Sequence, residues 1–270
     1  MRFLEIALCS KMSFYKLIDI AVYAELNQEL NKIWKPFQKQ GYENIPDIKL
    51  EWNISSKDFG DMQVLMPEYH SYTLKKESDI LFVNSDWSKS VIYSDNTDSA
   101  SVLLIYLFYS YLITRRTLLI HSSLIDHHGN GIMFLGPSGI GKTTQAELWN
   151  RYRGADILNG DMVFVRQWED GFYGYGSPWH GSSPYYKNAK VKLKAMITLE
   201  QAPENSIRKL SGFEVLQGMM DQVFLPHWYP EAMDDCLSTL DALLSEVPIY
   251  HLACRPDEDA VRLVEQELGL

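Results

Sequence analysis

A stretch of eight residues near the middle of the chain restricts the fold more than any other feature. Gly136–Thr143 reads GPSGIGKT and matches the pattern G-x-x-x-x-G-K-[ST] in full. The apolar run Ile132–Leu135 precedes it and is typical of a short strand buried on both faces. The residues that follow favour a helix from Gly141 to about Arg153. We therefore predict a strand, a loop and a helix within an α/β unit that has a central sheet.

The residue types in this loop suit a bound polyphosphate. Its glycines let the backbone curl so that successive N–H groups face one point, and the helix adds the partial positive charge of its N-terminus. Lys142 would reach the β- and γ-phosphates of ATP, and the Thr143 hydroxyl would bind Mg²⁺. The alternative is a glycine-rich turn without a ligand, but such a turn has no need of a lysine beside the positive end of a helix. The sequence therefore predicts a site for ATP and Mg²⁺.

A phosphate-binding loop of this kind works with an acidic side chain, usually at the end of a nearby strand. Asp161 follows Ile-Leu-Asn-Gly within Ile157–Val165, a segment that reads as a strand. Its carboxylate would hold magnesium through water or act as base on an attacking hydroxyl. The alternative is an aspartate in a turn, since Asn-Gly-Asp is good turn sequence. Beside the loop we favour the functional role.

Composition excludes several classes of protein. The net charge of −10 argues against a nucleic-acid partner, which would need basic surface. Cys9, Cys236 and Cys254 are widely separated and predict free thiols in a reducing compartment. The most apolar stretch, Val102–Thr114, is shorter than the ~20 residues that a membrane-spanning helix needs, so a buried helix is the better interpretation. We expect a cytoplasmic protein without a membrane partner.

The two halves of the chain differ in pattern. Residues 1–95 read as short, aromatic-rich β segments with one or two helices. Asp95–Asp98 offers side-chain oxygens for the N-cap of an apolar helix from about Ser99 to Thr114. We predict a smaller β-rich N-terminal domain, residues 1–116, that ends in this helix, and a catalytic α/β domain over residues 117–270. Other predicted strands are Ile48–Ile54, Ile80–Val83, Val91–Tyr93, Leu118–Ile125, Lys192–Leu199 and Pro248–Ala253, with helices at 211–223, 230–245 and 257–268.

The order of these segments resembles the HPr kinase/phosphorylase family and its relatives, a P-loop branch that also resembles phosphoenolpyruvate carboxykinase. Similar proteins are found beside peptide-modification genes and include the lasso-peptide kinases. The similarity covers about residues 118–253 and lies in order and spacing. It rests on a histidine (Leu119-Ile120-His121), a hairpin (Asp126–Gly131), GPSGIGKTT, ILNGDMVFV, and the segments Gly176–Gly181 and Lys192–Ile197.

The resemblance implies a carboxykinase-like P-loop fold, α/β in the catalytic domain and α+β overall, and roles for particular residues. His121 would sit near the transferred phosphoryl group, Asp161 would occupy the catalytic acidic position at the strand end, and Lys142 would act on the phosphates. Trp179 and His180 would lie on a loop facing the acceptor. The alternative for His121, Trp179 and His180 is a place in or over the core. The implied nucleotide-binding residues are Gly136, Pro137, Ser138, Gly139, Ile140, Gly141, Lys142, Thr143 and Thr144, with Thr143 and Asp161 as metal ligands.

The chain departs from the family pattern at two points. Many members carry two adjacent aspartates where this chain has Gly160-Asp161, so Asp161 would serve as both base and metal ligand, or another residue such as Asp126 would help. The glycine-, arginine- and asparagine-containing segment near the C-terminus of true HPr kinases has no counterpart, so HPr itself is not the expected acceptor. The alternative to a kinase is therefore a nucleotide-binding regulatory or assembly protein of the same fold.

The predicted reaction is transfer of the γ-phosphoryl group of Mg-ATP to a hydroxyl. The acceptor would be a serine or threonine of a peptide or protein, or a small molecule. A third reading, a carboxykinase acting on an oxoacid, would require a further metal-binding Lys/His pair and a carboxylate-binding arginine, and neither can be assigned. The sequence leaves homo-oligomerisation open.

Overall fold

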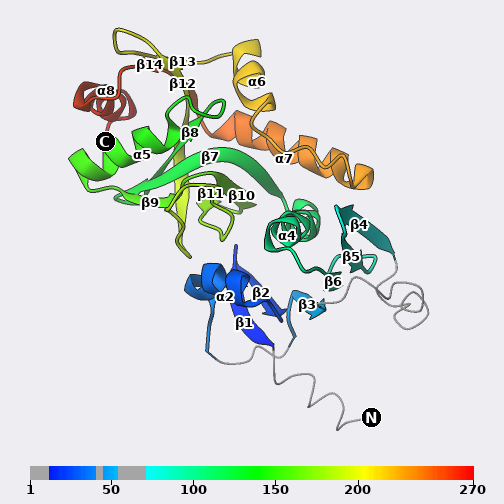
Figure 1. Cartoon of the computed structure of the whole chain (residues 1–270). Coiled ribbons are helices and arrows are strands. Elements are labelled where there is room, and N and C mark those ends of the chain that lie inside the picture. The colour runs from blue at the N-terminus through cyan, green and yellow to red at the C-terminus, as the bar shows by residue number, and fades with distance from the viewer. Residues whose placement is uncertain (1–11, 41–44, 54–70) are drawn as a thin grey trace, which may run out of the picture. The chain divides into compact units, whose positions relative to one another are not determined.

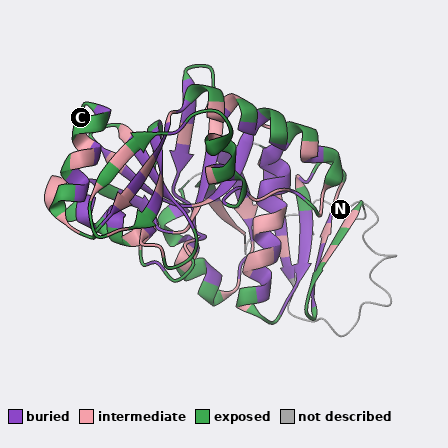
Figure 2. Cartoon of the chain, turned by 90° about the horizontal axis from the view of Figure 1, so that it is seen from above, coloured by how far each residue is buried: buried purple, intermediate pink, exposed green. Residues whose placement is uncertain are grey.

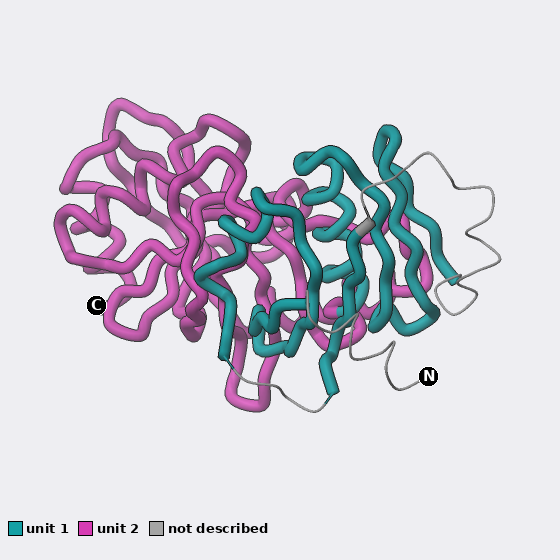
Figure 3. The backbone as a smooth tube through the Cα atoms, turned by 60° about the horizontal axis from the view of Figure 1, so that its bottom comes forward, with its two compact units in different colours: residues 1–111 teal, residues 112–270 magenta. Residues whose placement is uncertain are grey.

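The computed structural model describes residues 12–40, 45–53 and 71–270. Contacts divide the chain into two compact units, residues 1–111 and 112–270 (Figure 3). Cys9 and the end of the predicted strand at Ile54 lie outside the described residues. A division into domains between residues 116 and 117 stays a prediction.

The first unit is built on a six-stranded sheet with the order β1-β2-β3-β6-β5-β4. The predicted strands at Ile48, Ile80 and Val91 are confirmed, whereas β1, β2 and β4 were not predicted. The segment Asn31–Gln40, whose sequence pattern favours no single element, contributes to a helix and a 3₁₀ turn. The bounds in this unit are β1 (Ser13–Leu17), β2 (Ile20–Ala24), α2 (Gln28–Trp34), η1 (Lys35–Phe37), β3 (Ile48–Asn53), β4 (Tyr72–Lys76), β5 (Asp79–Val83) and β6 (Lys89–Tyr93).

Helix α4 (Thr97–Ile113) confirms the predicted apolar helix. The Asn96 side chain accepts hydrogen bonds from the backbone N–H groups of Asp98 and Ser99, as an N-cap residue does. Most side chains of α4 are buried, as expected for an apolar helix that has no polar face. Among the described residues, no helix is both long enough and apolar enough to cross a membrane.

The second unit is built on an eight-stranded mixed sheet. Its order is β11-β10-β7-β8-β12-β14-β13, with β9 also paired to β7 and β11 also paired to β12. The chain is thus an α/β protein with two sheets, as predicted. The strand bounds are β7 (Thr117–His127), β8 (Asn130–Leu135), β9 (Asp156–Asn159), β10 (Met162–Trp168), β11 (Gly171–Tyr175), β12 (Lys190–Gln201), β13 (Ser206–Lys209) and β14 (Ile249–Cys254).

Three neighbouring strands, β8, β12 and β14, are parallel. Their carboxyl ends therefore lie at one edge of the sheet, and the loop Gly136–Thr143 leaves from the end of β8 at that edge. Parallel strands are buried on both faces, which explains the continuous apolar run before the loop. Ligands of open α/β sheets bind outside this edge.

Helix α5 (Lys142–Arg153) packs against β7 and β8 and lies beside α8 (Glu258–Leu268), as Figure 1 shows. Between these helices and the sheet lies an apolar core that includes Phe134, Trp149 and Leu252. Buried residues follow the strands and the inner helix faces in Figure 2. The other helices are α6 (Phe213–Met220), η3 (Pro230–Ala232) and α7 (Met233–Glu246). The four helices predicted in this half are therefore confirmed as α5, α6, α7 and α8.

The predicted single strand Ile157–Val165 is wrong. It is two strands, β9 and β10, which pair with different parts of β7 and are separated by Gly160 and Asp161. The break arises because Asn159 turns the backbone, as described below. Strands β11 and β13 were not predicted. The face of β12 that carries Lys190, Lys192 and Lys194 is exposed to solvent.

Candidate functional site

The loop between β8 and α5 depends on glycine at three positions. Gly136, Gly139 and Gly141 have φ angles of 138°, 81° and 115°, in the region that side chains disfavour. Gly141 is also the N-cap of α5 and offers no side chain to the first helical amides. The sequence pattern of the loop is therefore a requirement of its backbone.

This loop presents amides without acceptors. Within the described part of the chain, the backbone N–H groups of Ser138, Gly139 and Gly141 donate to no protein group. The first turn of α5 adds amides that no side chain caps, at the positive end of the helix. N–H groups without acceptors beside a helix N-terminus fit an anion, and they are the observation that best supports a phosphate ligand here.

Lys142 lies across the loop that it terminates. It is only 7% exposed, and its Nζ donates to the carbonyl oxygens of Gly136 at 2.8 Å and Pro137 at 3.2 Å. Burial lowers the pKa of this ammonium group, and the charge of Asp161 acts in the opposite direction. The lysine side chain thus lies against the same loop that carries the amides without acceptors.

Asp161 lies near the first turn of α5, next to the residue that Thr143 contacts. The Thr143 hydroxyl is 3.4 Å from the carbonyl oxygen of Gly160, so the loop and the acidic turn are adjacent. The Asp161 carboxylate is 3.1 Å from Nε2 of His121. That hydrogen bond, with positive charge from His121, Lys142 and His180, lowers the pKa of Asp161 although partial burial raises it. Asp161 is therefore a carboxylate near neutral pH.

Asn159 holds this acidic turn, a role that was not predicted. Its Oδ1 accepts from the N–H groups of Asp161 at 2.8 Å and Met162 at 2.9 Å. Its Nδ2 donates to the carbonyl oxygens of Ser177 and Trp179, both at 3.1 Å. The side chain is fully buried. The sequence Asn-Gly-Asp is typical of a turn, but it does not indicate that buried side-chain hydrogen bonds hold this turn within the sheet.

The segment after β11 closes over Asp161. The Trp179 ring is 4% exposed and packs against Phe164, so this side chain belongs to the core. His180 is half-buried and stacks on Tyr186 with ring centroids 4.2 Å apart. Gly181 has a φ of 56°, and a Cβ there would be 2.5 Å from Oδ2 of Asp161. The predicted role of this segment toward an acceptor stays a prediction, with His180 as its more accessible side chain.

Asp126 is not brought to the site. Its Oδ1 accepts from the N–H of Gly129 in the hairpin after β7. It is five residues beyond His121 on the same strand, which corresponds to about 17 Å. A second carboxylate at this position cannot assist Asp161 directly. Ser123, which was not predicted, instead supports the loop by donating to the carbonyl oxygen of Lys142 at 2.9 Å.

The donors present fit magnesium bound together with a nucleotide. Mg²⁺ is usually held by one or two protein oxygens with phosphates and water, and Thr143 and Asp161 offer a hydroxyl and a carboxylate. Across the described ranges, no cluster of three or more His, Cys, Asp or Glu side chains could form a metal site of its own. Cys236 and Cys254 are buried, and neither forms a disulfide within the described part of the chain.

Comparisons with known proteins find similarity over about half of the chain. No protein-family profile matches the chain. A curated HPr kinase/phosphorylase from Brevibacillus brevis is 27% identical over 158 residues, which is 55% of this chain and 46% of the relative. The chain thus spans about half the length of that relative. The solved structure of the Hpr(Ser) kinase/phosphatase from Coxiella burnetii has 14% identity and a TM-score of 0.32, and the match covers 56% of this chain and 92% of that one. The predicted resemblance to the HPr kinase/phosphorylase family is therefore confirmed as a sequence similarity to this curated relative.

Proposed function

We propose that the protein is an ATP-dependent phosphotransferase that moves the γ-phosphoryl group of Mg-ATP to a hydroxyl. The observation that carries this proposal is the position of the Asp161–His121 pair beside a glycine loop that has backbone amides without acceptors and a buried lysine. A site for the terminal phosphate and a base for an incoming hydroxyl then adjoin each other. The similarity to an HPr kinase/phosphorylase supports the same class of reaction.

In this reaction the acceptor oxygen forms a bond to the γ-phosphorus, the bond to the bridging oxygen breaks, and ADP leaves. Asp161 accepts the proton of the hydroxyl, and His121 orients the carboxylate through its hydrogen bond. Lys142 and the loop amides stabilise the charge on the phosphoryl oxygens. When bound, magnesium would neutralise further charge on the phosphates, held by Thr143 and Asp161.

The proposed acceptor is a serine or threonine of a peptide or protein, or the hydroxyl of a small molecule. A cytoplasmic location and a possible assembly of several copies stay predictions from the sequence. HPr itself is not the proposed acceptor, because the sequence has no counterpart of the C-terminal segment of true HPr kinases.

The test is transfer of radioactive phosphate from γ-labelled ATP to candidate peptides and hydroxyl compounds, followed by mass spectrometry of the product. We expect Asp161→Asn to retain ATP binding and to lose transfer by about 10²- to 10⁴-fold, the usual contribution of a general base. Full activity in this variant would place the base elsewhere.

One observation favours a second function, that of a nucleotide-binding regulatory or assembly protein. Asp126, the candidate for a second carboxylate, lies near the distant hairpin, so Asp161 would have to act as both base and metal ligand. The two functions differ in a simple measurement. A kinase consumes ATP faster when its acceptor is added, whereas a regulatory protein binds ATP and does not respond to any acceptor.

A further inference from the structure

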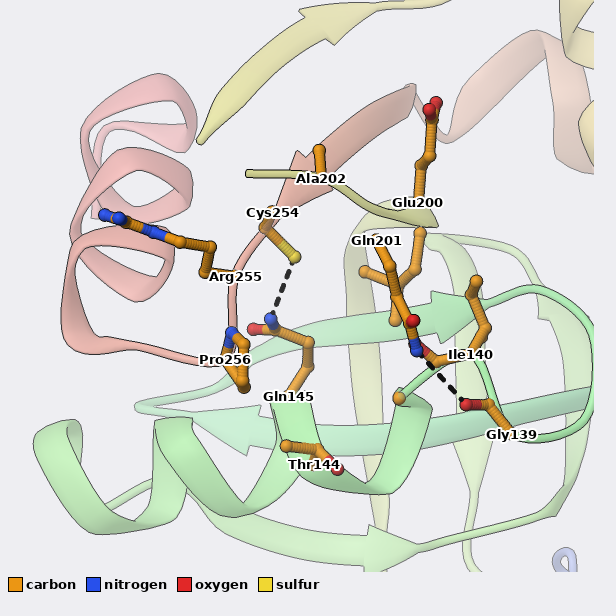
Figure 4. A pocket seen from close by; sticks show the side chains of 12 residues that line it. Gly139, Ile140, Thr144, Gln145, Glu200, Gln201, Ala202, Cys254, Arg255 and Pro256 are labelled. Atoms are coloured by element: carbon orange, nitrogen blue, oxygen red, sulfur yellow. Dashed lines mark hydrogen bonds between the residues drawn. The ribbon is translucent and has the colours of Figure 1, made fainter. Parts of the chain in front are cut away.

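A pocket opens on the side of the loop opposite Asp161. It has a cavity volume of about 340 Å³ and is formed by the loop, the first turn of α5 and the carboxyl ends of β12 and β14. Figure 4 shows it with the side chains of Gln145 and Cys254 pointing toward each other. The volume lies at the lower end of the range for small-molecule sites, about 300–1,000 Å³. Its lining includes Ile140, Thr144, Gln145, Ala202, Cys254 and Pro256.

The position of the pocket follows from consecutive residues of α5. Thr143 faces Gly160 and the acidic turn, whereas Thr144 and Gln145 line the pocket. A polyphosphate on the loop with its terminal group at Asp161 would therefore have its other end at Thr144, where the pocket begins. This step rests on the proposed function, because it requires the terminal phosphate to lie at Asp161.

The interior of the pocket suits a neutral, flat group. Ile140, Ala202 and Pro256 are apolar. Burial raises the pKa of the Cys254 thiol, so it stays uncharged. The charged groups of the pocket already have partners, because Glu200 pairs with His251 at 2.9 Å and Arg255 with Asp257 at 3.1 Å. A second phosphate would find no unpaired cation there among the described lining residues.

Gln145 supplies the polar contact. It is 3% exposed, and its Nε2 donates to Sγ of Cys254 at 3.1 Å. Its Oε1 is buried and has no hydrogen-bond partner among the residues that the structure describes. A buried acceptor without a donor is costly, and an amino group on a bound ligand would satisfy it. Adenine carries such an amino group, whereas guanine has a carbonyl oxygen at the corresponding position.

We infer that this pocket binds the nucleoside part of the nucleotide and that Gln145 selects adenine over guanine. The triphosphate loop and the base pocket are then two separable sites with a common boundary at Thr144. The loop determines whether any polyphosphate binds, and the pocket determines which nucleoside it carries.

The test compares the dissociation constants of ATP, GTP and inorganic tripolyphosphate, each with Mg²⁺, by isothermal titration calorimetry on the full chain. We expect the protein to bind ATP at least about tenfold more tightly than GTP. Gln145→Ala should weaken ATP binding about tenfold, bring the two nucleotides close together, and leave tripolyphosphate binding unchanged. Ala202→Phe should fill the pocket and reduce binding of both nucleotides while tripolyphosphate still binds. Gln217→Ala, on the exposed side of α6, is the matched control and should change none of the three.

Two results would overturn the inference while leaving the proposed function intact. One is an equal affinity for ATP and GTP in the unmodified protein, and the other is an equal loss of ATP and tripolyphosphate binding in Gln145→Ala. Failure of the unmodified protein to bind either ATP or tripolyphosphate would contradict the proposed function, and the inference with it.

Discussion

His121 on β7 and Asp161, in the turn just before β10, face each other with Nε2 3.1 Å from Oδ1. The contact is fixed by the backbone as well as by the side chains. Met162 pairs with His121 in the register of β10 and β7, and the N–H of Ser122 donates to the carbonyl oxygen of Asp161 at 2.9 Å. The histidine therefore acts on a carboxylate whose position the sheet already determines.

The first prediction concerns pH. The hydrogen bond from His121 is the largest influence that lowers the pKa of Asp161, so activity should fall only when the pH drops through that lowered value. His121→Ala removes the bond and its charge, so the pKa rises and the acid limb of the kcat/KM profile should move to higher pH. His121→Gln keeps a donor and should show a smaller shift. An acid limb at the same pH in all three proteins would mean that Asp161 is not the titrating base.

The second prediction concerns the loop lysine. Lys142→Ala removes the positive charge that lies against the loop and should weaken ATP binding by about a hundredfold. The fold should persist, because the lysine bonds only to carbonyl groups of its own loop. Calorimetric titration measures the affinity, and circular dichroism checks the fold. Lys194→Ala, on the exposed face of β12, is the control. Unchanged nucleotide affinity in Lys142→Ala would remove the loop from the proposed mechanism.

The third prediction uses two glycines with similar backbone strain. Gly181 and Gly129 both have positive φ angles, 56° and 83°, so an alanine costs about 1–2 kcal/mol of backbone strain at either. Only at Gly181 would the new Cβ meet the Asp161 carboxylate, whereas at Gly129 nothing lies within 4 Å. Gly181→Ala should therefore lower kcat by at least about tenfold with ATP affinity unchanged, and Gly129→Ala should not. Equal kcat values for Gly181→Ala and Gly129→Ala would show that catalysis does not depend on the position in which Gly181 leaves the Asp161 carboxylate.

The fourth prediction concerns stability. Asn159→Ala leaves two backbone N–H groups and two carbonyl groups in the acidic turn without their partner. We expect the free energy of unfolding to fall by about 2–4 kcal/mol, measured by urea denaturation followed by tryptophan fluorescence. The exposed Asn188→Ala should change it by less than about 0.5 kcal/mol. A similar value for both variants would mean that the turn is held without Asn159.

The sequence alone determined the parts of the protein whose physics is local. The loop Gly136–Thr143 could be predicted because only glycine adopts its φ angles and because a helix must start where the lysine stands. The apolar helix near residues 99–114 and the strand before the loop could be predicted from their continuous apolar runs, which exclude an exposed position.

The features that depend on strand pairing could be recognised in the folded protein and not in the sequence. The turn at Asp161 looked like the interior of a strand, because the hydrogen bonds of Asn159 that break β9 from β10 reach residues about 20 positions away. The approach of His121 to Asp161 follows from the register of β7 and β10, and the pocket at Gln145 from strand ends separated by more than fifty residues. A local pattern records the preferences of the backbone, but these contacts join segments that come together only when the sheet forms.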